Sequence, residues 1–219
     1  MTGAEQEIYR PRVPPYGRID RDYGKRLRSP AADGPIYMLN LTRYHPDVPH
    51  GRHDSAGVNG LDSGGRYAPL DVLAAIGARL CFVADVVASP GNWHRVFVVG
   101  YPSRRSFVAM AARYDFMNWH HNMATGVEET VVMGVLPIGM LPGQSTSWTL
   151  LEAWSGPRPA PVAPGPVSEF AVEGTLIGDG RQWSGVRYTA IEPGTPLPLD
   201  PASPGYDALL LEPTIERWL

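Results

Sequence analysis

The sequence predicts an α+β fold in which a βαββαβ unit, residues 35–137, is followed by a degenerate second copy, residues 138–219. One observation is that strand-like and helix-like patterns alternate up to residue 137 in the order of a ferredoxin-like unit. Another is that the hairpin pattern of CFVADVVASPGNWHRVFVVGYPS (81–103) returns in FAVEGTLIGDGRQWSGVRYTAIEP (170–193). The eight strands of two such copies would close around a shared interior.

Residues 1–34 are expected to form an extended arm, because Pro, Arg and Gly are frequent there and no apolar period is present. Basic side chains cluster in this segment but are interleaved with acidic ones, and the whole chain carries a net charge of −3. A solvated arm is therefore expected, and no nucleic-acid partner.

The first copy begins with a predicted strand, PIYMLNLTRY. A helix is expected over 68–79, because Pro69 suits a first-turn position and Asp71 lies near the positive end of the helix dipole. Ser103 can cap a second helix. The strands expected in this copy are 35–44, Leu80–Ala88, His94–Tyr101 and TVVMGVLP (130–137).

A long loop rich in Gly, Asp and His, residues 45–67, separates the first strand from the first helix and is expected to be a flexible lid. It contains His50, His53 and Asp54. Three donors without a second cluster are a weak metal signal, so no metal is expected.

The second copy keeps the strand patterns SWTLLEAWSG, the second hairpin and YDALLLEPTIERWL. Where helices would stand it has PRPAPVAPGP and GTPLPLDPASPG, which cannot form regular helices because proline lacks a donor and clashes with the preceding turn. An unrelated β-extension is the alternative to duplication.

Composition sets further limits. A single cysteine, Cys81, excludes an intrachain disulfide, and no apolar run approaches the roughly 20 residues of a spanning helix. We therefore expect a cytoplasmic protein without a membrane partner. Phosphate loops, dinucleotide fingerprints and nucleophile elbows are absent from the sequence, so no cofactor is expected.

The segments YMLNLTRY, GARLCFVADVV, WHRVFVVGYPSRRSFVAM and YDFMNWHHNMATGVEETVV resemble domain-of-unknown-function family 1330 of the dimeric α+β barrel superfamily. The resemblance covers about residues 35–137, and the second copy lacks its helices and Tyr-Pro-Ser-Arg step. It implies an intrachain dimeric-α+β-barrel-like fold. Superfamily relatives include polyketide cyclases, cofactor-free monooxygenases and isomerases, which bind an apolar substrate.

Strand alternation supplies two candidate site residues. In the first strand Tyr37, Leu39 and Leu41 suit a helix-packed face, which leaves Asn40 facing a cleft. In the second strand Asp85 lies opposite an apolar set, where burial would make its carboxylate useful as a general base. A solvent-exposed strand end is the alternative for Asp85.

Three further residues complete the candidate set. His120 falls on the apolar stripe of a helical segment, where it could be an acid or base or a satisfied core histidine. Glu173 occupies a position in the second hairpin close to that of Asp85 in the first. Arg187 could neutralise one of these carboxylates, although all could also form the polar face of a half-exposed sheet.

Three functions are compatible with these features. The first is a cofactor-independent enzyme that performs cyclisation, isomerisation or dehydration by proton transfer on a hydrophobic, polyketide-like or aromatic metabolite. The second is a cofactor-free monooxygenase on a similar substrate, and the third is a non-catalytic small-molecule binding protein. The chain is expected to be a monomer or a homodimer.

Overall fold

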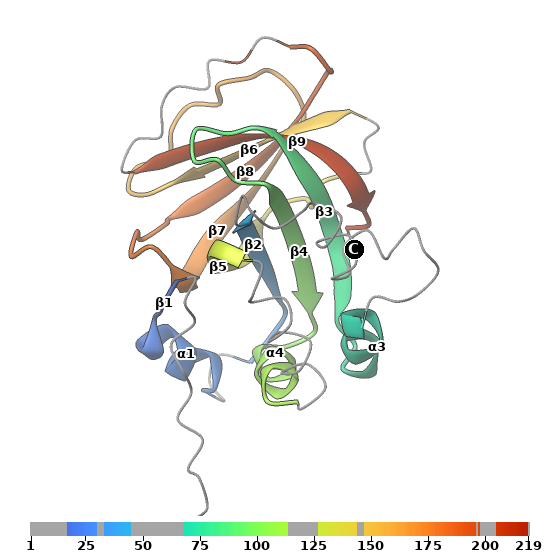
Figure 1. The fold of residues 1–219 in the computed structure, drawn as a ribbon, viewed down its shortest axis with the longest axis vertical. Helices are drawn as coiled ribbons and strands as arrows, with labels where there is room; N and C mark the ends of the chain where they lie inside the picture. The colour runs from blue at the N-terminus through green and yellow to red at the C-terminus, as the bar shows by residue number, and fades with distance from the viewer. Residues whose placement is uncertain are drawn as a thin grey trace, which may run out of the picture.

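A closed barrel of eight antiparallel strands dominates the computed structural model (Figure 1). The structure describes residues 17–29, 33–44, 68–113, 127–143, 147–195, 197 and 205–218. Around the barrel the strands follow the order β7-β5-β2-β4-β3-β9-β6-β8, and β8 pairs with β7 to close it. The strands are β1 (Arg18–Ile19), β2 (Ile36–Tyr44), β3 (Arg79–Ala88), β4 (Arg95–Tyr101), β5 (Val127–Ile138), β6 (Trp148–Trp154), β7 (Val167–Gly178), β8 (Gly185–Ile191) and β9 (Tyr206–Glu216).

The predicted fold class, an α+β fold of two ferredoxin-like units, is wrong, and the dimeric α+β barrel implied by the resemblance is corrected with it. The strands of the two halves join along β5–β7 and β3–β9, so they form one closed sheet. The helices in the described residues are short: α1 (Arg21–Leu27), α3 (Ala68–Ala75) and α4 (Arg104–Ala111). The helical patterns of the sequence thus produce small covers on a mostly β protein.

Both halves nevertheless pair their strands in a common order. The first half runs β5-β2-β4-β3 and the second runs β9-β6-β8-β7, so in each the fourth strand is followed by the first, third and second. The two hairpins that are similar in sequence, β3–β4 and β7–β8, therefore hold equivalent places in the two halves. Internal duplication stays a prediction.

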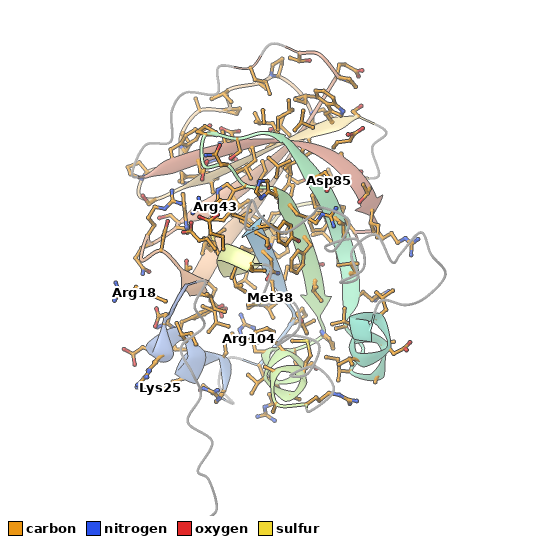
Figure 2. The ribbon with its side chains drawn as sticks, viewed as in Figure 1. Arg18, Lys25, Met38, Arg43, Asp85 and Arg104 are labelled. Carbon is orange, nitrogen blue, oxygen red and sulfur yellow. The ribbon has the colours of Figure 1, made fainter. Side chains whose placement is uncertain are left out.

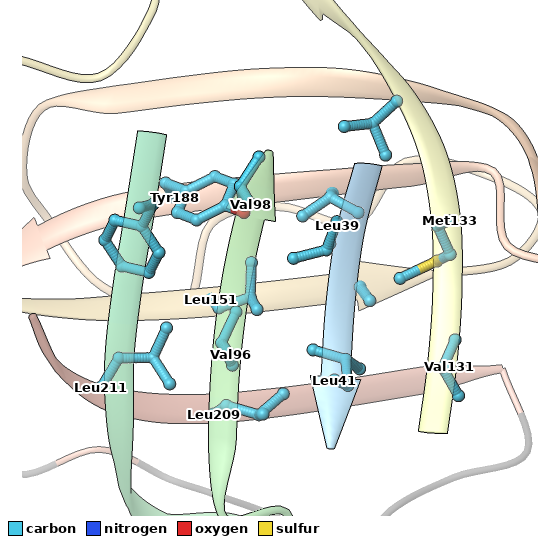
Figure 3. Packing of buried hydrophobic residues seen from close by; sticks show 14 of the residues in the cluster. Leu39, Leu41, Val96, Val98, Val131, Met133, Leu151, Tyr188, Leu209 and Leu211 are labelled. Carbon is cyan, nitrogen blue, oxygen red and sulfur yellow. The ribbon is translucent and has the colours of Figure 1, made fainter. Parts of the chain in front are cut away.

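The barrel interior is filled by apolar side chains from all eight strands (Figure 3). Leu39 and Leu41 are fully buried there, whereas Met38 packs against the outer cluster beneath the helices. The expected parity of this strand is therefore reversed. Because both faces of β2 are buried, its alternation alone does not identify the interior face.

Local capping explains where two of the helices begin. The Oγ of Ser103 accepts a hydrogen bond from the backbone N–H of Ser106 at 3.1 Å, which confirms the expected cap of α4. Asp20 caps α1 through the N–H groups of Asp22 and Tyr23. Part of the segment expected to be an extended arm thus forms β1 and α1, and Tyr23 and Leu27 are buried against the barrel.

No helix among the described residues has the length and apolar character needed to cross a membrane. The loop expected to be a lid, residues 45–67, lies outside the described residues, as do His50, His53 and Asp54.

Candidate functional site

Asp85 lies on the outer face of β3, half exposed, and pairs with Arg95 on β4. The Arg95 Nη2 and Nε atoms donate to Asp85 Oδ1 at 2.7 and 2.9 Å. The interior face of β3 carries Phe82 and Ala84, as the sequence pattern indicated. Asp85 is therefore an ion-paired group at the surface of the barrel.

Asn40 also lies on the outer face, because its neighbours Leu39 and Leu41 point into the barrel. Its side-chain amide donates to the backbone carbonyl of Met38 at 3.0 Å. The expectation that Asn40 faces a cleft in the interior is therefore wrong. His120 lies outside the described residues.

Glu173 joins two helices to the barrel wall. The Arg104 Nε donates to both carboxylate oxygens at 3.0 Å, its Nη2 also pairs with Glu173, and Tyr23 Oη donates to Oε1 at 3.2 Å. The hydrogen bonds to Glu173 raise the pKa of Arg104. Burial and the Glu173 charge raise the pKa of Tyr23. Figure 2 shows Arg104 and Asp85 well apart, so Asp85 and Glu173, which hold similar positions in the two hairpins, belong to separate ion pairs.

Arg187 is fully buried on the outer side of β8 and is held between two carboxylates. Its Nε donates to Glu169 at 2.8 Å and its Nη1 donates to Glu152 at 3.2 Å. The hydroxyl of Tyr206 donates to Glu152 at 2.8 Å, and Arg187 Nη2 donates to the carbonyl of Pro159 at 2.7 Å. We call Glu152, Glu169, Arg187 and Tyr206 the outer ion cluster.

The outer ion cluster has a clear structural consequence. Pro159 belongs to the proline-rich connector between β6 and β7, so Arg187 ties this connector to the barrel wall. Burial acts to raise the pKa of Glu169, but hydrogen bonds from Arg187 and Arg158 outweigh it and lower that pKa. The partners of Arg187 are thus Glu152 and Glu169, and neither Asp85 nor Glu173 neutralises it.

A different buried carboxyl lies at one end of the barrel interior. Asp207, at the start of β9, is 1% exposed and accepts a hydrogen bond at Oδ2 from Trp93 Nε1 at 3.0 Å. Its Oδ1 is buried and has no hydrogen-bond partner among the described residues. A Cβ on Gly91 would lie 2.7 Å from Trp93 Nε1, so glycine is needed for this close approach of the hairpin turn.

Arg181, in the turn between β7 and β8, connects Asp207 to the surface. Its Nη2 lies 3.9 Å from Asp207 Oδ2, its Nε donates to Asp179 at 2.5 Å, and its guanidinium covers the Trp183 ring at 4.5 Å. Burial raises the pKa of Asp207, and the Trp93 hydrogen bond and the Arg181 charge only partly oppose this.

Outside Arg181 lies an open groove of about 390 Å³, which we call the arginine groove. Thr175 pairs with the interior residue Met133, so it faces inward at the base, and its buried hydroxyl has no hydrogen-bond partner. Gly180 has a φ of 99°, a conformation that favours glycine, and it lets the turn approach Arg18. The lining consists of Arg18, Ile19, Asp20, Arg21, Thr175, Gly178, Gly180, Arg181 and Gln182.

Charge in the arginine groove is unbalanced. Arg18 and Arg21 are exposed and form no ion pair with the described residues, while Arg181 is paired with Asp179. The Oδ1 of Asp20 is occupied by the N-cap of α1. Arg18, Arg21 and Arg181 carry three positive charges and Asp20 and Asp179 carry two negative ones, so about one positive charge remains uncompensated around the groove. Figure 2 shows Arg18 at the margin of the molecule, where a solute can reach it.

Metal ligands are not grouped in this region. Within the part of the chain that the structure describes, no three His, Cys, Asp or Glu side chains are arranged to hold a metal ion. The chemistry offered by the groove is that of guanidinium, hydroxyl and amide donors.

No residue at this end of the barrel belongs to the candidate set that the sequence predicted. Arg18 and Arg21 were assigned to a solvated arm, and Asp207 stands before an apolar run where a turn residue would also fit. The Gly-Asp-Gly-Arg sequence of the second hairpin was a signal of a turn that can present a cation. That this turn lies beside the N-terminal arginines follows only from the strand pairing, which places Arg18 opposite Gly178.

Comparison with known proteins gives no family. No family model matches the chain, and no curated protein matches it. The chain is similar to a protein of unknown function from Rhodopseudomonas palustris, a structural genomics target, with 27% sequence identity and a TM-score of 0.42 over 57% of this chain and 99% of that one. A methylated form of that protein matches with 27% identity and a TM-score of 0.42, over 58% and 98% of the two chains. The likeness is too low for an argument about fold or site, and membership of family 1330 stays a prediction.

Proposed function

We propose that the protein binds a small organic anion with two negative charges, such as a phosphate monoester or a dicarboxylate, in the arginine groove. The observation that carries this proposal is the pair of guanidinium groups of Arg18 and Arg21, which form no ion pair with the described residues and lie beside a third arginine. Guanidinium forks match carboxylate and phosphate oxygens, and the two guanidinium groups of Arg18 and Arg21 offer one partner for each charge of such a ligand.

Neutral donors around the groove support the same ligand. The Thr175 hydroxyl is buried without a partner, and such groups are uncommon unless something else satisfies them. The Gln182 side chain is exposed at the rim and adds an amide donor. An anion at the base of the groove would accept from Thr175 while the arginines neutralise it.

The barrel interior is a less favourable place for a ligand. Its axis is occupied by a cluster in which Phe82, Phe170, Tyr188 and Trp218 contact one another with ring centroids 5.4–5.7 Å apart. Proton-transfer catalysis on a hydrophobic metabolite stays a prediction. The candidate residues Asp85, Glu173 and Arg187 are engaged in ion pairs outside the groove, so binding is the function that the contacts support best.

Isothermal titration of the full chain with sulfate, inorganic phosphate and succinate tests this proposal. Arg18→Gln and Arg21→Gln should each weaken binding roughly tenfold or more, since a hydrogen bond to a charged group contributes about 1.5–3 kcal/mol. The affinity should also fall with added salt, because the arginines are exposed.

Lys25→Gln is the matched control. It removes one positive charge from α1, but Lys25 pairs with Asp22 and does not line the groove, so the affinity should stay within about twofold. Stronger binding of phosphate than of succinate would indicate a phosphate monoester, and the reverse would indicate a dicarboxylate. Equal losses in all three variants would reduce the effect to net charge and overturn the site, as would the absence of binding.

A further inference from the structure

Among the described residues, Asp207 is the buried acid with the fewest contacts to offset the free-energy cost of burying its charge. It is almost fully buried, and only the Trp93 indole N–H donates to its side chain at hydrogen-bond distance. The second carboxyl oxygen has no partner. A buried carboxylate normally requires several donors or a close cation, so this position retains an acid at a cost to folding.

The groups around Asp207 come from four parts of the fold. The turn between β7 and β8 contributes Arg181 and Asp179, and the turn between β3 and β4 contributes Trp93. Arg43 of β2 lies over the Trp93 ring at 5.8 Å and is itself paired with Glu128 and Glu129 of β5. The Ala208 N–H of β9 also interacts with the Asp207 carboxyl. Arg181 is thus the cation closest to Asp207, and it also lines the arginine groove.

This shared arginine connects the groove to the acid. We propose that an anion enters the arginine groove together with a proton, and that Asp207 holds this proton. The inference rests on the proposed function. An anion that binds Arg181 draws its guanidinium toward the groove and away from Asp207. The carboxylate then loses its nearest positive charge and takes a proton from solvent. By linkage, if anion binding favours protonation of Asp207, protonation of Asp207 favours anion binding to the same degree.

The chemical state of Asp207 agrees with this geometry. Burial raises the pKa of Asp207 without a ligand, which favours its protonated form. Since the bound form would hold the extra proton, binding should become tighter as the pH falls. A monoprotonated complex also fits a doubly charged ligand, because the proton prevents repulsion between the ligand and the buried carboxylate.

The experiment is titration with sulfate at pH 5 to 8 in pairs of buffers that differ in ionisation enthalpy. Sulfate is chosen because, unlike phosphate, it does not titrate in this range. Wild-type protein should take up a measurable fraction of a proton per sulfate, up to about one. Its affinity should fall by up to about tenfold per pH unit across the titration of Asp207.

Asp207→Asn mimics the protonated acid, so it should bind sulfate at every pH about as the wild type does at low pH, without proton uptake. Arg181→Gln should weaken binding and also abolish proton uptake, although Asp207 is intact, and it serves if Asp207→Asn does not fold. Asp179→Asn is the control, because Asp179 is exposed and pairs with Arg181 while the Asp207 carboxyl and Arg181 both stay in place. Its proton uptake should persist.

The outcomes separate the two proposals. Absence of sulfate binding to the wild type overturns the proposed function. Binding with identical heats in both buffers, or proton uptake that persists in Asp207→Asn, leaves the groove in place and overturns the role of Asp207.

Discussion

The outer ion cluster and Asp207 both bury carboxylates, but they satisfy them to very different degrees. In the cluster every nitrogen of Arg187 donates to an oxygen at 2.7–3.2 Å, and Glu152 accepts from both Arg187 and Tyr206. Asp207 has one hydrogen bond and an oxygen without a partner. Burial acts to raise the pKa of both Glu169 and Asp207, yet only Glu169 has enough partners to end with a lowered pKa.

The difference shows how a buried charge can indicate function. A saturated network such as the outer ion cluster fixes one arrangement, here a proline-rich connector against a barrel wall. A buried carboxyl with few partners can still gain or lose a proton and can still form a new contact when a ligand binds. Sequence alone does not distinguish these cases, since both begin as an acid within or beside an apolar strand.

The largest effect is expected for Arg187→Met, which leaves Glu152 buried without its cation. Breaking a buried ion pair from one side costs about 3–5 kcal/mol, so the free energy of unfolding should fall by this amount in urea denaturation. Sulfate affinity should not change, because Arg187 lies outside the arginine groove. The double variant Arg187→Met/Glu152→Leu should recover part of the loss. A single-variant loss below about 1 kcal/mol would contradict the structural account of the cluster.

A smaller loss is expected for Tyr206→Phe. This change removes the hydroxyl that donates to Glu152 and keeps the ring, so it should cost about 1.5–3 kcal/mol, the contribution of a hydrogen bond to a charged group. A double-mutant cycle with Glu152→Gln measures the pairing directly. If the two changes are additive, the hydroxyl does not stabilise the carboxylate and the saturation argument weakens.

Asp85→Asn should change stability by less than about 1 kcal/mol. Asp85 is half exposed in its pair with Arg95, and ion pairs at solvent-exposed sites contribute about 0–1 kcal/mol. The measurement is urea denaturation at pH 7. A loss above about 3 kcal/mol would show that this pair behaves like the outer ion cluster and not like a surface contact.

The strands of this fold and their closure around a shared interior were largely predictable, but their union in one continuous sheet was not. Ranges for β2, β3, β4 and the two hairpins follow from apolar patterns and turn residues, and Ser103 identified the start of α4. The interior face of β2 could not be chosen, because both of its faces are buried. The sequence predicted too much helix. A helix was expected over 68–79, for example, but α3 ends after two turns at Ala75.

Prediction of the site failed for a related reason. Arg187 was correctly singled out, but its partners depend on the register that places Glu152 and Glu169 directly opposite it. The arginine groove depends on pairing between residues about 160 positions apart, Arg18 with Gly178, which no local pattern encodes. Sequence indicated which residues were unusual, whereas strand pairing decided which of them met.

The smallest change in stability is expected for Asp207→Asn, and its size should depend on pH. The pKa of Asp207 is raised in the folded protein, so the unfolded chain loses its proton first as the pH rises above the ordinary value of 3.8. The contribution of Asp207 to the free energy of unfolding is therefore greatest below pH 3.8. It falls as the pH rises toward the pKa of Asp207 in the folded protein and is constant above it. Asparagine does not titrate, so the variant should gain stability relative to the wild type between pH 4 and pH 8, as measured by urea denaturation at each pH.

Trp93→Phe sharpens this last prediction because it acts in the opposite direction. Removing the indole N–H takes away a hydrogen bond that favours the charged form of Asp207, so the decline with pH should be larger in total and extend to higher pH than in the wild type. The double variant Trp93→Phe/Asp207→Asn should lose this dependence, since no titrating group remains at the position. A pH dependence that is equal in all four proteins would show that Asp207 has its ordinary pKa, and the contrast with the outer ion cluster would then rest on geometry alone.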